Sequence, residues 1–283
     1  MNLWPCEIFK VFIKYFESAH GQLTSFIRLI ADEGERFHYS FVAAKRLMEV
    51  NMGFFYMDQY YLVLVVPALI ISMIASFRVR TTFNKYREIG NSKNMTGADV
   101  ARYLLQSNGI YDVQVTRIKG ELTDHYDPRK KELRLSDSTY SSISVAAVGV
   151  AAHETGHAIQ HSVKYGPLAL RSSLVPVANI GSQAGPTLAI LGLILSWSVL
   201  INIGLLLFAA AILFYLITLP VEFNASSRAI ESLDRHNILM KDELQSAKKV
   251  LNAAALTYVA SALVAIANFL RLLLLAGNRR NRD

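Results

Sequence analysis

The residues with the clearest chemistry form one short motif, His153-Glu154-Thr155-Gly156-His157. The motif lies in a proline-free stretch, residues 143–161, whose apolar residues recur at helical spacing. On a helix, two histidines four residues apart face the same way and can hold one metal ion. Zinc lowers the pKa of a bound water to about 7, and Glu154 is placed to take the proton of that water. The motif predicts one zinc ion per chain, with Glu154 as general base.

A catalytic zinc site needs a third protein ligand besides His153 and His157. The extended form of the motif places a histidine where this chain has Val163, and His161 lies too far along the same helix face to reach the same ion. The downstream candidates are Glu222, Glu231, Asp234, His236, Asp242 and Glu243. Glu222 is favoured by its position directly after a long apolar stretch. The alternative for Glu222 is an acid stabilised by the dipole of a helix N-terminus.

The composition excludes several classes of protein. Of 283 residues, 52% are hydrophobic and only 18% are charged, whereas a soluble globular protein has about a quarter charged residues. The net charge of +7 is modest and scattered, so it does not favour binding to nucleic acid. The single cysteine, Cys6, excludes an intrachain disulfide framework and a cysteine-rich zinc module.

The missing charge is concentrated in three stretches. Uncharged runs of 19, 50 and 21 residues lie between Asp58 and Arg78, between Arg171 and Glu222, and between Lys249 and Arg271. A membrane-spanning helix needs about 20 apolar residues, so these runs hold one, two and one spans. The alternative, buried helices of a large soluble core, is less consistent with uncharged apolar runs of this length.

We therefore expect a mainly α integral membrane protein, with four transmembrane helices and a small α+β zincin-like metallopeptidase segment. The two middle spans form a hairpin with a tight turn near residues 196–202, and Arg271 should snorkel to the membrane surface. The predicted parts are an N-terminal extension (1–57), transmembrane helix 1 (58–78), a polar segment with a small sheet and the motif helix (79–173), the transmembrane hairpin (174–219), a third-ligand helix segment (220–249) that opens at Pro220, transmembrane helix 4 (250–276) and a basic tail (277–283).

Two further expectations concern orientation and the start of translation. Four spans place both polar segments on one side of the membrane, and more Lys and Arg flank those segments than flank the opposite side. The positive-inside rule then favours a cytoplasmic active site. The first 57 residues lack the architecture of a signal peptide. They form either an amphipathic surface helix or an untranslated stretch, and we expect translation to start at Met52 or Met57.

The polar segment 79–173 also contains local structure. The sequence predicts a helix over residues 98–107, with Thr96 as its N-cap and Gly109 as the residue that ends it. Residues 113–118 and 132–135 alternate like strands, with turn chemistry at 127–130. This pattern predicts a small antiparallel sheet. The strand at 132–135 either pairs with an extended substrate or serves only its own sheet.

Other polar residues are candidates for supporting roles. A donor is needed for the developing oxyanion of the reaction, and His236 is the catalytic candidate that we name for it. Further candidates are Arg228, His125, Tyr126 and Tyr140. Asn224 and Arg228 are candidates to orient a zinc ligand through hydrogen bonds. Each of these residues also has a purely structural alternative.

Several stretches resemble the YugP-like family of bacterial membrane zinc metallopeptidases. These are the motif at residues 153–157, the two-span insertion after it, Val221-Glu222-Phe223-Asn224-Ala225-Ser226, residues 122–128 and residues 133–136. The resemblance runs from about Met57 to the C-terminal end. The plan is distantly similar to HtpX-type and CAAX-prenyl endopeptidases, in which an E-F-x-A-D motif supplies the third ligand. Ser226 departs from the final acid of that motif.

The resemblance implies a gluzincin-type, multi-pass metallopeptidase of the bacterial cell membrane, acting on a peptide or membrane-protein substrate beside the lipid bilayer. The residues by themselves leave two alternatives. One is a non-proteolytic membrane protein with a structural zinc site, and the other is a zinc hydrolase acting on a lipid or small amide.

Overall fold

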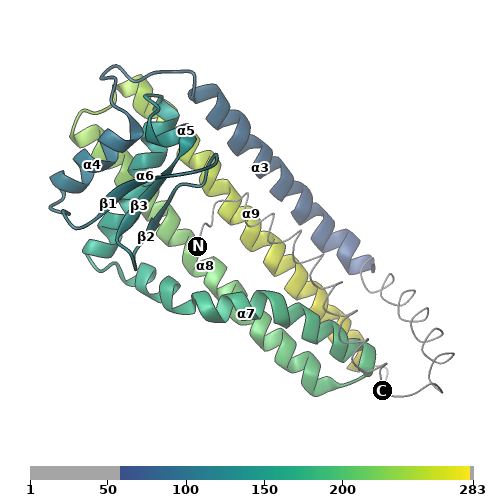
Figure 1. Ribbon diagram of the computed structural model, residues 1–283. Helices are drawn as coiled ribbons and strands as arrows, with labels where there is room; N and C mark the ends of the chain where they lie inside the picture. Colours follow the sequence, from purple (N-terminus) through teal and green to yellow (C-terminus); the bar gives the residue numbers. More distant parts are fainter. Residues whose placement is uncertain (1–57, 281–283) are drawn as a thin grey trace, which may run out of the picture. The chain divides into compact units, whose positions relative to one another are not determined.

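The computed structural model describes residues 58–280 (Figure 1). The predictions for residues 1–57, including a start at Met52 or Met57, lie outside the described residues. The elements are a π-helical turn η2 (Tyr61–Val65), α3 (Val66–Tyr86), α4 (Gly97–Ser107), β1 (Gln114–Ile118), β2 (His125–Asp127), β3 (Glu132–Ser136), α5 (Asp137–Tyr140), α6 (Val145–Ser162), α7 (Gly166–Leu195), α8 (Ser198–Arg235) and α9 (Lys241–Arg280).

Four helices in the described part are long and apolar enough to cross a membrane: Tyr61–Tyr86, Gly166–Leu195, Ser198–Arg235 and Lys241–Asn278. With the small sheet beside them, they confirm the predicted class, a mainly α membrane protein with an α+β segment. The prediction that a helix opens at Pro220 is wrong, because α8 runs through Pro220 without interruption. Proline has no backbone N–H, so one hydrogen bond of the helix is lost. In a membrane protein, neighbouring helices can satisfy the carbonyl that this leaves without a donor.

The chain divides into two compact units. In the described part, the first unit comprises Ile71–Pro176 and Leu213–Ala262, and it contains the sheet, α4, α6 and the zinc motif. The second unit comprises residues 58–70, Val177–Ile212 and residues 263–280. All of the candidate site residues described below belong to the first unit.

The sheet of the first unit has the order β1-β3-β2. β2 pairs antiparallel with β3, but β1 pairs parallel with β3, so the prediction of an antiparallel sheet is wrong for β1. The alternating pattern located β1 and β3 but not β2, and it does not encode the direction of pairing, which depends on the path of residues 119–124 between β1 and β2. Helix α4 begins as predicted at Thr96, whose side chain accepts from Asp99 N in a capping box.

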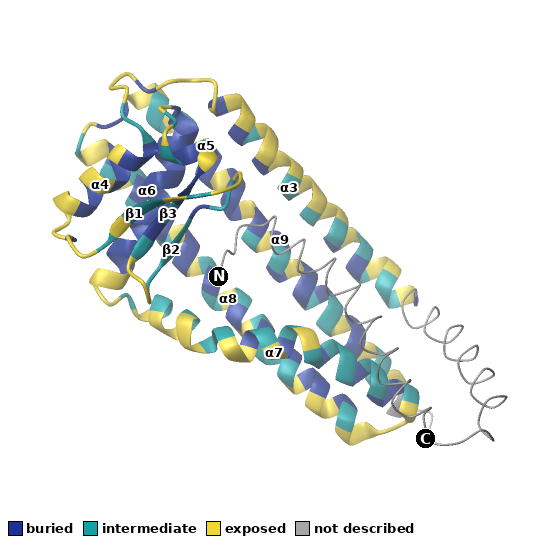
Figure 2. Ribbon diagram, viewed as in Figure 1, coloured by how far each residue is buried: buried dark blue, intermediate teal, exposed yellow. Residues whose placement is uncertain are grey.

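Helix α6, which carries the zinc motif, is buried along nearly its whole length (Figure 2). Ser144 caps it by accepting a hydrogen bond from Ala147 N at 3.1 Å. One face of α6 packs against α4, α8 and α9 in a cluster that includes Val148, Leu104 and Leu233, and another packs against the sheet around Leu133. A helix fixed on several sides holds its polar side chains in one place.

In the second unit, α7 and α8 approach closely and the turn between them is short. A Cβ on Gly204 would meet Gly185 O at 2.6 Å, and a Cβ on Gly185 would meet Phe208 N at 2.8 Å, so both glycines are needed for this packing. Ser196, between the two helices, has a φ of 58°.

The expectation that Arg271 snorkels is wrong. Its side chain is only 4% exposed, and its Nε donates to Asp58 Oδ2 at 2.7 Å. The guanidinium also lies over the ring of Tyr61, 5.3 Å from its centroid. The carboxylate of Asp58 pairs with the guanidinium of Arg271, so the Arg271 charge is compensated where it is buried and the side chain does not extend to the surface.

Candidate metal centre

Three side chains from two helices converge in the first unit. His153 and His157 lie one turn apart on α6, and Glu222 reaches them from α8. Glu222 Oε2 is 3.3 Å from His153 Nε2 and 3.5 Å from His157 Nε2. All three residues are buried, and their candidate donor atoms lie within 4.8 Å of one another. The structure thus brings together the three residues that the sequence predicts as ligands.

The donor set fits a zinc ion. Zinc takes His nitrogen and carboxylate oxygen at about 2.0–2.1 Å in a tetrahedron, in which neighbouring donors stand about 3.4 Å apart. The two distances from Glu222 Oε2 match that spacing. The same oxygen is buried and accepts no hydrogen bond from any described residue. A buried carboxylate oxygen without a partner is costly unless a cation compensates it.

The outer nitrogens of both histidines also have partners. His153 Nδ1 lies 3.1 Å from Ser226 Oγ, and His157 Nδ1 lies 3.0 Å from Gln160 Oε1. With Nδ1–H donating to these oxygens, Nε2 keeps its lone pair free for a metal. Ser226, which occupies the position of the final acid in the E-F-x-A-D motif, therefore contacts a histidine.

A chain of amide contacts backs the second histidine. Gln160 Nε2 donates to Val221 O at 2.8 Å and to Asn224 Oδ1 at 3.0 Å. Arg228 Nε donates to the same Asn224 oxygen at 2.8 Å. Asn224, predicted as an orienting residue, therefore connects to His157 through Gln160, and Arg228 connects to it through Asn224 and Gln160.

Glu222 is held from two further helices. Arg171, near the start of α7, places Nη1 3.2 Å from Glu222 Oε1, and its side chain is 15% exposed. Tyr258 of α9 lies next to the Glu222 carboxyl. Because Arg171 engages Oε1, the other carboxylate oxygen, Oε2, is the one turned to the histidines.

Glu154 occupies a buried position beside the ligands. Burial raises the pKa of its carboxyl to about 7, and the nearby carboxylates of Asp124 and Glu222 contribute, against the opposing effect of His153. The backbone N–H of Tyr126 in β2 points toward this carboxyl. Asp124 is itself buried, accepting from Ser136 N and Ser136 Oγ at 2.8 Å each. β2 therefore runs past the group predicted as the general base.

The close approach of α8 to α6 depends on the glycine inside the motif. A Cβ on Gly156 would lie 2.6 Å from Ala225 O. Ala225 follows Glu222 by almost one helical turn, so the absence of a side chain at Gly156 allows Glu222 to come within reach of the histidines.

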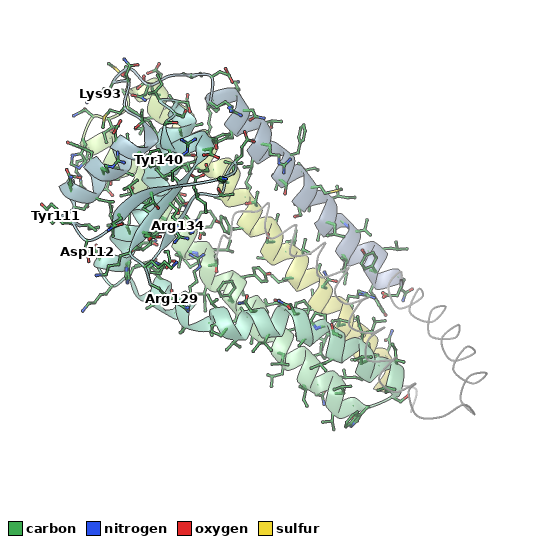
Figure 3. The ribbon with its side chains drawn as sticks, in the orientation of Figure 1. Lys93, Tyr111, Asp112, Arg129, Arg134 and Tyr140 are labelled. Carbon is green, nitrogen blue, oxygen red and sulfur yellow. The ribbon has the colours of Figure 1, made fainter. Side chains whose placement is uncertain are left out.

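The other predicted candidates lie elsewhere. His236 follows Glu222 by fourteen residues, about 21 Å along the helix rise, and its ring packs edge-on against Tyr103 of α4 at 5.4 Å. Its role as a catalytic donor stays a prediction. Tyr140, labelled in Figure 3, is engaged through its hydroxyl with Arg102 Nη2 at 2.7 Å.

Two residues of β2 also have partners away from the ligands. Tyr126 Oη lies 2.8 Å from His161 Nδ1, and His125 Nδ1 lies 2.9 Å from Thr123 O. Burial raises the pKa of Tyr126 to about 12 and lowers that of His125.

The alternative in which the strand at 132–135 pairs with a substrate is wrong. That strand is β3, the centre of the sheet, with β1 on one side and β2 on the other. Among the described strands, β1 and β2 form the edges of the sheet, and β2 runs beside Glu154.

Comparison with known proteins places the chain in a family. Residues 61–277 match the family described as "Putative neutral zinc metallopeptidase". The chain belongs to this family of zinc metallopeptidases. A protein of Bacillus subtilis (strain 168), named "Putative membrane protease YugP", is 45% identical over 223 residues, which are 79% of this chain and 99% of that protein. The resemblance expected from the motifs is thereby confirmed. No solved structure matches the chain.

The sequence did not predict the contacts of four residues around the candidate metal centre: Gln160, Arg171, Ser226 and Tyr258. Two of them had signals in the sequence. Gln160 follows His157 by three residues, so it shares that face of the helix. Arg171 and Glu222 are the charges at either end of the 50-residue apolar run, and the ends of a membrane hairpin return to the same surface.

Proposed function

We propose that this protein is a membrane-bound zinc-dependent endopeptidase. In this proposal His153, His157 and Glu222 hold one zinc ion, and Glu154 is the general base. The observation that carries the proposal is the buried Glu222 Oε2, which has no hydrogen-bond donor among the described residues and faces the Nε2 atoms of both histidines.

A zinc ion held by these residues would act as a Lewis acid and would lower the pKa of a bound water to about 7. Glu154 accepts a proton from the attacking water and then donates it to the amine that leaves. A group that both accepts and donates works best when its pKa lies near the working pH. Burial raises the pKa of Glu154 to about 7, which supports this role.

The residues behind the ligands have positioning roles. Ser226 and Gln160 fix the histidine tautomers. Arg171 holds the outer oxygen of Glu222 and so directs the inner oxygen to the metal. Contacts of this kind typically change metal affinity or activity by about 10- to 100-fold.

The substrate in this proposal is a peptide or membrane-protein chain. Among the described strands β2 pairs with β3 alone, so it is an edge strand there, and it lies next to Glu154. An extended peptide can add to such an edge through main-chain hydrogen bonds. The distribution of Lys and Arg supports a cytoplasmic active site.

The donor set favours catalysis over a structural site. Structural zinc sites are usually closed by four protein ligands, whereas catalytic sites keep one position open. The described residues provide one group of three donors here, with a buried carboxylate beside it.

The test compares wild type with Glu154→Gln, both purified in detergent, for zinc content and casein cleavage. We expect the variant to keep about one zinc per chain and to lose cleavage. Glu88→Gln, an exposed position outside the site, is the matched control and should cleave like wild type. Equal cleavage by Glu154→Gln and wild type would refute the assignment of the general base.

A further inference from the structure

A basic groove lies between α3 and α9 in the first unit, and none of its lining residues belongs to the candidate metal ligands. It has a volume of about 380 Å³. Its lining residues come from the end of α3 and the first half of α9; Figure 1 labels both helices. Its lining residues are Arg78, Thr81, Thr82, Lys85 and Tyr86 on α3, and Lys249, Asn252, Ala253 and Leu256 on α9.

Three positive charges line this groove from both sides. Arg78 and Lys85 come from α3, and Lys249 comes from α9. Among the described residues that line the groove none is acidic, and no ion pair joins these three cations to a described carboxylate. The ammonium of Lys85 lies over the ring of Tyr86, 5.6 Å from its centroid. Like charges gathered in this way are stabilised by an anion.

The groove continues into apolar surface along both helices. On α3, Arg78, Thr81, Thr82 and Lys85 follow helical spacing, and the same face extends back from Arg78 to Ile74 and Ile71. Ile74 is 60% exposed and Ile71 is 48% exposed. On α9 the next turns present Leu256 and Val259, which are 44% and 41% exposed. Both helices are among those long and apolar enough to span a membrane.

We propose that this groove binds the phosphate headgroup of an anionic phospholipid. The cations contact the phosphate, and the acyl chains lie on the apolar face of α3. Basic pockets between membrane helices bind such headgroups, and each Lys or Arg near the surface contributes about 1 kcal/mol, a factor of about five in affinity. A free phosphate would use the same cations but would gain nothing from the apolar surface.

The experiment titrates the purified full-length protein in detergent with dioleoyl-phosphatidylglycerol or dioleoyl-phosphatidylcholine and counts bound lipid by native mass spectrometry. We expect wild type to retain one phosphatidylglycerol in preference to phosphatidylcholine. Lys249→Gln should bind it about fivefold more weakly, and the triple variant Arg78→Gln/Lys85→Gln/Lys249→Gln about a hundredfold. Lys248→Gln, which removes the neighbouring exposed charge outside the groove, is the matched control and should bind like wild type.

Further measurements distinguish a lipid headgroup from free phosphate as the ligand. Inorganic phosphate at millimolar concentration should leave the bound lipid in place, and complete displacement by it would overturn the lipid in favour of a free anion. Equal retention of both lipids, or wild-type retention by the triple variant, would also overturn the proposal. Lys249→Arg should keep binding, and zinc content and thermal unfolding of each variant verify that it folds. If the triple variant fails to fold, the contrast between Lys249→Gln and Lys248→Gln decides.

Discussion

Gly156→Ala is expected to weaken the metal site without touching a ligand. The added Cβ would lie 2.6 Å from Ala225 O, and 3.2 Å from the Cα and carbonyl carbon of Ala225. To restore an ordinary contact, α6 and α8 must separate by about 0.8 Å, because packed interiors have no room to absorb the overlap. Glu222 lies less than one turn from Ala225 and must move with it.

The size of the effect follows from the tolerance of metal coordination. Zinc–ligand distances vary by only about 0.2 Å in good sites, so a shift of about 0.8 Å removes most of the contribution of Glu222. We expect zinc affinity to fall by at least about tenfold, the scale seen when a supporting contact is lost. Overpacking should also lower the free energy of unfolding by about 1–3 kcal/mol.

The assay is a zinc competition titration against a chromophoric chelator, with thermal unfolding measured in parallel. Gly149→Ala is the matched control on the same helix. Its added Cβ would meet Ala247 Cβ at 3.3 Å, a smaller overlap and one directed at α9 rather than α8. We expect Gly149→Ala to bind zinc like wild type. If Gly156→Ala binds zinc as tightly as wild type, the argument that this glycine sets the position of Glu222 is wrong.

Three further predictions concern other charged groups. Arg171→Ala should lower zinc affinity about 10- to 100-fold by releasing Glu222, with Arg171→Lys intermediate; equal affinity in all three proteins would remove Arg171 from the site. In zinc-free protein, Glu154 has its pKa raised to about 7, so ionisation opposes folding, and stability should fall by up to about 3 kcal/mol as the pH rises from about 4.5 through 7. Thermal unfolding at pH 5 and pH 8 should show this loss for wild type but not for Glu154→Gln, and parallel profiles would contradict it. Asp58→Asn leaves Arg271 buried without its charge partner and should destabilise the protein by about 3 kcal/mol or more, while replacing both residues by Leu should cost less; thermal unfolding in detergent compares them.

Much of the candidate metal centre could be predicted for two reasons. Part of it is a short motif on one helix, and Glu222 is the charged residue that ends a long uncharged run. His153 and His157 lie about one helical turn apart, and that spacing alone places them on a common face, with Glu154 next to His153. Glu222 was predicted from its place at the end of an apolar run. The same reasoning, applied to the other end of that run, would have found Arg171.

Other features depend on packing that no short pattern encodes. Ser226 meets His153 only because α8 lies against α6 at Gly156. Arg271 reads as a charge near the end of a span, and its pairing with Asp58 joins residues that are 213 positions apart. The parallel pairing of β1 with β3 is likewise set by the path of the chain between the strands, and the alternation of apolar and polar residues does not predict it.

The order of the ligands along the chain has a consequence for biosynthesis. His153 and His157 are translated before the uncharged run at residues 172–221, which holds most of α7 and the first part of α8, and Glu222 is translated immediately after that run. A nascent chain that has not yet produced the hairpin therefore holds only two of the three donors. Arg171 likewise lacks its partner until residue 222 has been added. The centre is completed only once the second helix of the hairpin is made, so a ribosome-bound fragment cannot carry the full site ahead of its membrane segments.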